Sequence, residues 1–73
     1  MTQADRNLID YIVACISEFA NQYGMHMRDA YVYLNHYKGI EFLKEFYDVE
    51  HTLSFEDAVD DLAAICRKNG GAA

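Results

Sequence analysis

The chain has 73 residues, of which 52% are hydrophobic and 25% charged, and its formal net charge is −6. A composition this apolar excludes an intrinsically disordered chain. The chain has twelve Asp and Glu but only six Lys and Arg, and this excess of acids disfavours binding to the phosphate backbone of nucleic acids. No apolar run approaches the ~20 residues of a membrane-spanning helix. The sequence therefore predicts one small globular domain.

The first predicted element is a helix over residues 4–23. Its apolar residues recur at steps of three and four, which places them on one face of a helix. Gly24 supplies the left-handed residue that ends a helix at low cost. We expect the following side chains to form one stripe that faces the core: Ile9, Ile12, Val13, Ile16, Phe19, Ala20 and Tyr23.

A second, shorter helix is predicted over residues 27–37. His26 stands at the N-cap position, where Ser or Asp is typical, so the start of this helix is weakly marked. Lys38 and Gly39 end it, with glycine as the left-handed residue. Its expected core stripe consists of Ala30, Tyr33, Leu34 and Tyr37.

The third predicted helix, over residues 40–50, is apolar on two sides. Phe42 and Val49 point nearly opposite to the main stripe. Such a helix is either enclosed in the core or covered by another molecule. The main stripe consists of Ile40, Leu43, Phe46 and Tyr47.

The last predicted helix spans residues 55–68, with Ser54 as its N-cap and residues 70–73 as a flexible tail. His51 and Thr52 belong to the connector before this cap, where their side chains are expected to bond to backbone groups. The predicted fold is all-α, a compact bundle of about four helices whose first pair is helix-turn-helix-like. The stripe of the last helix consists of Phe55, Ala58, Val59, Leu62, Ala63 and Cys66.

The compartment is inferred from the N-terminus and the cysteines. The first residues lack a basic leader followed by an apolar stretch, which predicts that the chain carries no secretory signal. Cys15 and Cys66 fall near apolar stripes, where a free thiol behaves as a small hydrophobe. We therefore expect a cytoplasmic protein with both thiols reduced.

Several segments together resemble a family of small bacterial proteins catalogued as domain of unknown function 3791. They are LIDYIVACI at residues 8–16, FA at 19–20, YGM at 23–25, FYDVEHT at 46–52 and AVDDL at 58–62. The resemblance covers residues 7 to 65, and His26 departs from the family pattern. It implies no assigned activity. It implies an accessory protein encoded beside an ADP-ribosyltransferase-like toxin, and thus an antitoxin-like or immunity-like role.

Exposed aromatic side chains and an acidic helix face favour binding to another protein. Large rings on the surface of a small domain are good interface anchors, and unneutralised acids attract a basic partner. The partner is a second protein or, through the third helix, another copy of the chain. The alternative is that these rings are buried and these acids merely solvated. The candidate partner-binding residues are Tyr31, Phe42, Val49, Asp57, Asp60 and Asp61.

The alternative function is a helix-turn-helix DNA-binding regulator. The outward side chains of the second helix sum close to neutral, whereas a DNA reader combines base-contacting residues with several cations. Catalysis is disfavoured because no nucleophile–base pair, phosphate loop or paired acids can be assembled. His26, His36 and His51 lie on different segments without metal-ligand spacing, so we expect no metal and no cofactor.

Overall fold

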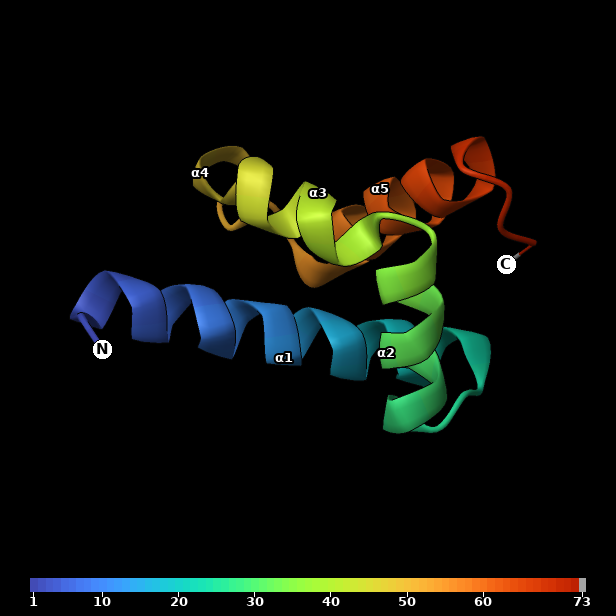
Figure 1. Ribbon diagram of the computed structural model, residues 1–73, viewed down its shortest axis with the longest axis horizontal. Coiled ribbons are helices and arrows are strands. Elements are labelled where there is room, and N and C mark those ends of the chain that lie inside the picture. The colour runs from blue at the N-terminus through green and yellow to red at the C-terminus, as the bar shows by residue number, and fades with distance from the viewer. Residues whose placement is uncertain (73) are drawn as a thin grey trace.

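The computed structural model describes residues 1–72, and within them the chain is all-α, as predicted (Figure 1). The predicted tail reaches into Ala73, which lies outside the described residues. The helices are α1 (Gln3–Tyr23), α2 (Met27–His36), α3 (Gly39–Glu45), α4 (Tyr47–Glu50) and α5 (Phe55–Lys68).

Helix α1 is the longest element, and local signals set both of its ends. Thr2 Oγ1 accepts the Asp5 amide at 3.1 Å while the Asp5 carboxylate accepts the Thr2 amide, so the two residues form a capping box. Gly24 has φ 65° and ends the helix, as the sequence predicts. The chain then turns, and α2 crosses the C-terminal half of α1 (Figure 1).

The predicted third helix is in fact two helices, which corrects the expectation of one element over residues 40–50. The backbone leaves the helical region at Phe46, where φ is −108° and ψ is 22°. The break changes the direction of the chain, so that the Tyr47 ring packs on Tyr11 of α1 with centroids 5.5 Å apart. The rings of Phe42 and Phe46 instead contact each other at 5.2 Å.

The turn between α2 and α3 also differs from the expectation. The left-handed residue is Lys38, with φ 74°, and not Gly39. Gly39 is buried, and a Cβ atom there would lie 3.0 Å from Leu34 Cδ2. The glycine therefore allows α3 to pack closely on α2, where a Cβ atom would force Leu34 to shift, and the preceding lysine adopts the unfavourable backbone conformation.

The core lies where α1, α2, α3 and α5 meet. Its largest fully buried side chains are Phe19, Leu34, Leu43, Leu62, Val59, Cys15 and Cys66. Both cysteines are free thiols. Other predicted core residues are largely exposed, which corrects the stripes drawn from the sequence: Ile9, Val13, Tyr23, Phe46 and Phe55. Among residues 1–72, no helix is long and apolar enough to cross a membrane.

Candidate functional site

The N-terminal half of α1 carries two large apolar side chains, Ile9 and Val13, that are exposed to solvent. Ile9, Val13, Ile16 and Ala20 follow one another at steps of four, three and four, and therefore share one face of the helix. Ile16 and Ala20 are only 6% and 4% exposed, whereas Ile9 is 45% and Val13 50% exposed. The same face is thus buried in the second half of α1 and open in the first.

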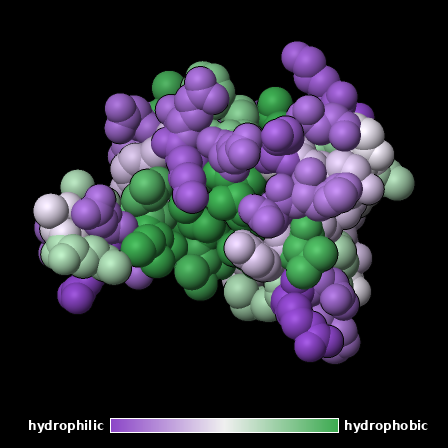
Figure 2. Space-filling view, in the orientation of Figure 1, coloured by the Kyte–Doolittle hydropathy of each residue, from purple (hydrophilic) through white to green (hydrophobic). Residues whose placement is uncertain are grey.

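The position of α2 explains this difference. Helix α2 packs on the second half of α1, where the rings of Phe19 and Tyr33 lie 5.8 Å apart. Because α2 runs across α1 and not along it, it covers the second half of α1 and leaves the first half uncovered (Figure 1). Figure 2 shows apolar side chains gathered over this part of α1 and towards α3. We call the exposed pair Ile9 and Val13 the α1 apolar surface; Ile12 of the same segment is buried in the core, and Leu8 packs against the core.

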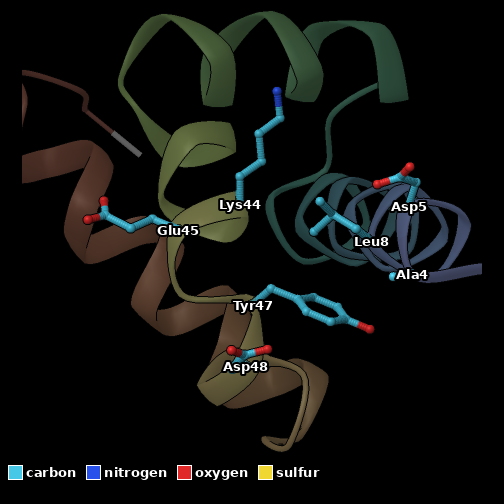
Figure 3. A pocket seen from close by; sticks show the side chains of 7 residues that line it. All are labelled: Ala4, Asp5, Leu8, Lys44, Glu45, Tyr47 and Asp48. Carbon is cyan, nitrogen blue, oxygen red and sulfur yellow. The ribbon is translucent and has the colours of Figure 1, made fainter. Parts of the chain in front are cut away.

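Beside the α1 apolar surface lies a depression of about 280 Å³ between the start of α1 and the α3–α4 junction. Leu8 and Tyr47 form its apolar part, and in Figure 3 the Tyr47 ring extends towards α1 and Leu8. The charged lining residues are Asp5, Glu45, Asp48 and Lys44. Three acids against one lysine give this edge a negative charge.

The structure separates the predicted partner-binding residues into several places. Phe42 and Asp61 lie at the same place on the surface, because both line a second depression, of about 260 Å³, between α3 and α5. Phe42 is half-buried against the core. Tyr31 is exposed on α2 and Val49 is exposed on α4. Two further predicted residues, Asp57 and Asp60, are exposed on α5.

The junction residues make local hydrogen bonds to the backbone. His51 Nδ1 lies 2.6 Å from the carbonyl oxygen of Tyr47, and because a carbonyl only accepts, this nitrogen carries the proton. Thr52 Oγ1 donates to the Val49 carbonyl oxygen at 2.6 Å. Ser54 Oγ accepts the Asp57 amide at 3.1 Å and caps α5.

A buried acid that the sequence reasoning missed lies at the end of α4. The Glu50 side chain is only 4% exposed. Its Oε1 atom is buried without a hydrogen-bond partner among the described residues. Burial, followed by the hydrogen bond and the charge of Asp61, raises the pKa of Glu50 from 4.5 to about 7.

Two side chains of α1 adjoin this pair of acids. Burial and then the Cys15 thiol raise the pKa of Tyr11, and the charges of Glu50 and Asp61 add to the effect. Burial also raises the pKa of the Cys15 thiol. Both groups therefore remain neutral around pH 7. In residues 1–72, no group of three or more His, Cys, Asp or Glu side chains has a geometry that could hold a metal ion.

Fold and surface together define a small all-α domain with an incompletely covered first helix. The model of one protein family, described as a protein of unknown function (DUF3791), matches residues 10–69. The chain belongs to this family, which confirms the resemblance seen in the sequence. No curated protein and no solved structure matches the chain.

Proposed function

We propose that this protein is a non-enzymatic cytoplasmic module that binds another protein through the α1 apolar surface. The supporting observation is the change in burial along one face of α1. Ile9 and Val13 are about half exposed, although the next two residues of the same face are buried. Removing such aliphatic side chains from water is favourable by about 25 cal/mol per Å² of apolar surface.

The expected partner segment is an amphipathic helix with Lys or Arg beside its apolar stripe. A surface that lacks a covering helix is suited to receive one, in the position that α2 occupies further along α1. The chain carries a net charge of −6, and three acids line the adjoining depression. A second copy of the chain would bring like charges together, so a basic partner fits better.

The family resemblance suggests the natural partner. It implies a toxin encoded beside the protein, in which case this chain acts as an antitoxin. The α1 apolar surface would then be the part of the antitoxin that docks on the toxin.

Two synthetic helical peptides test the proposed chemistry directly. Both carry the same leucine stripe, flanked by lysines in one peptide and by glutamates in the other. We expect the lysine peptide to bind more tightly, and its affinity to fall as salt is raised, because salt screens exposed charges. Equal affinity for the two peptides would contradict the proposed partner.

Matched variants locate the binding site. The double variant Ile9→Ser, Val13→Ser should lose the lysine peptide, whereas Val32→Ser, which changes an equally exposed residue of α2, should retain it. Circular dichroism melts verify that all three proteins remain folded. Retention of the peptide by the double variant would exclude the α1 apolar surface. A dimer seen by light scattering and abolished by the double variant would identify a second copy as the occupant.

The alternative, a helix-turn-helix regulator, has weaker support. The exposed side chains of α2 include Arg28, Asp29, Asn35 and His36, whose formal charges cancel when histidine is neutral. DNA affinity depends on several phosphate-binding cations. Retention of the purified protein on duplex DNA at low salt would favour this alternative over protein binding.

A further inference from the structure

Helix α5 carries a stripe of accessible side chains on the side that faces away from the core. Asp57, Asp61, Ala64 and Lys68 follow one another at steps of four, three and four, so they share one face of the helix, and Ile65 lies beside them. These residues are exposed or half-buried, whereas the opposite face of α5 is buried in the core. We call them the α5 stripe.

The middle of the α5 stripe is apolar and hollowed. Asp61, Ala64 and Ile65 line the depression of about 260 Å³ between α5 and α3, and Phe42 lines it from α3. Ala64 contributes only a methyl group, which leaves room for a larger side chain from outside. In Figure 1 the helices α3 and α5 lie above α1, so this depression is separate from the α1 apolar surface.

The apolar middle of the α5 stripe lies between two opposite charges. Asp61 precedes Ala64 by three residues, and Lys68 follows Ile65 by three. Each charge is therefore about 5 Å along the helix from the point midway between Ala64 and Ile65. Within the part of the chain that the structure describes, Lys68 makes no ion pair, so its charge is available to another molecule.

We propose that α5 pairs antiparallel with α5 of a second copy of the chain, about a two-fold axis between Ala64 and Ile65. Such an axis places each residue opposite the residue that lies equally far on the other side of the centre. Ile65 of each copy then packs on Ala64 of the other and enters the depression beside Phe42. Asp61 lies opposite Lys68 in both halves of the dimer. This dimer goes beyond the proposed function and does not depend on it.

The charge pattern of the α5 stripe is what favours a second copy at this surface. An isologous contact requires a surface that is complementary to itself, and here an acid and a base lie at matching positions about an apolar centre. The depression beside α1 differs, because three acids and one lysine line it. The remaining acid of the stripe, Asp57, lies far from the axis. The two Asp57 side chains would be about 22 Å apart along the helices, well beyond the screening length of about 8 Å at physiological salt.

Sedimentation equilibrium of the full chain over a series of concentrations tests the dimer. At about 0.15 M salt, which screens the long-range repulsion between two copies of charge −6, the mass should rise from one chain towards two. Ala64→Glu places a larger, charged side chain at the axis and should remain monomeric. Asn35→Glu adds the same charge at an exposed position of α2 and should dimerise like the wild type. A wild type that is still monomeric at about 1 mM, or an Ala64→Glu protein that dimerises normally, would overturn the proposal.

Two charge-reversed variants test the antiparallel register. Asp61→Lys sets two lysines opposite each other, and Lys68→Glu sets two acids opposite each other, so each variant alone should dimerise at least about tenfold more weakly. An equimolar mixture of the two should associate like the wild type, because every lysine in the mixed dimer again faces an acid. Arg28→Glu, which reverses an exposed cation of α2, should leave the dimer unchanged. A mixture that associates as weakly as its two components would refute this register and with it the proposal.

The double variant Ile9→Ser, Val13→Ser separates the dimer from the proposed function. It should lose the lysine peptide and keep the dimer, because the two surfaces lie on different helices. A dimer that this variant abolishes and that Ala64→Glu leaves intact would place the second copy on α1 and exclude α5 pairing. Circular dichroism melts verify that the variants fold. Should Asp61→Lys fail to fold, Ala64→Glu and Lys68→Glu still decide.

Discussion

Replacing Glu50 by glutamine should make the stability of the protein less dependent on pH. The wild-type carboxyl group has a pKa of about 7 when folded, against an ordinary value of 4.5. Below pH 4.5 it is protonated in both states and has no effect on the folding equilibrium. As the pH rises from 4.5 to 7, the unfolded chain loses the proton while the folded protein keeps it, so the free energy of unfolding falls. Above pH 7 the folded protein loses the proton as well, and the free energy of unfolding falls no further.

The size of this loss follows from the two pKa values. The folded protein binds the proton roughly 300-fold more tightly than the unfolded chain, which corresponds to about 3 kcal/mol. Nearly all of this free energy is lost at pH 8, and only a small part at pH 5. Relative to the wild type, Glu50→Gln should therefore gain about 2–3 kcal/mol between pH 5 and pH 8.

Urea unfolding of the wild type, Glu50→Gln and Glu45→Gln at the two pH values measures this gain. For a domain of this size, about 3 kcal/mol is a large part of the total stability, so the shift of the urea midpoint is easily resolved. Glu45→Gln is the control for loss of one exposed negative charge. A constant difference between Glu50→Gln and the wild type at both pH values would refute the reasoning.

Two further outcomes are expected, both for substitutions in the turn between α2 and α3. Lys38→Gly should raise the free energy of unfolding by roughly 0.5–1 kcal/mol, because it relieves a left-handed residue with φ 74°; an unchanged melting temperature would contradict this. Gly39→Ala should lower it by about 1–3 kcal/mol, since the new methyl group meets Leu34 Cδ2 at 3.0 Å, and an equally stable variant would show that α3 can shift.

The ends of the long helices could be predicted because their signals are local. Gly24 and Ser54 act through their own backbone geometry or hydroxyl group, and both are where the sequence places them. The break at Phe46 has no such signal, since no glycine or proline lies between residues 40 and 50. It results from packing, because α4 must change direction for Tyr47 to reach Tyr11.

The α1 apolar surface was missed for a related reason. Periodicity shows which face of a helix is apolar, but it does not show how far along the helix a neighbour covers that face. Ile9 and Val13 belong to the same stripe as the buried Ile16, so the sequence assigns all three to the core. Only the place and direction in which α2 crosses α1 separate them. The sequence correctly predicts that these residues share one face of α1, but it is wrong in predicting that Ile9 and Val13 are buried.

The acid pair was also outside the reach of sequence reasoning, although one signal was present. Glu50 continues the helical spacing of Leu43 and Tyr47, and an acid in an apolar stripe indicates a buried charge that needs a partner. Which partner it finds depends on how α4 meets α5. Tyr47 and Glu50 are three residues apart on a single helical turn, and Tyr11 adjoins both the Tyr47 ring and the charge of Glu50. Tyr11 therefore links the surroundings of the buried acid to the ring that lines the depression beside α1.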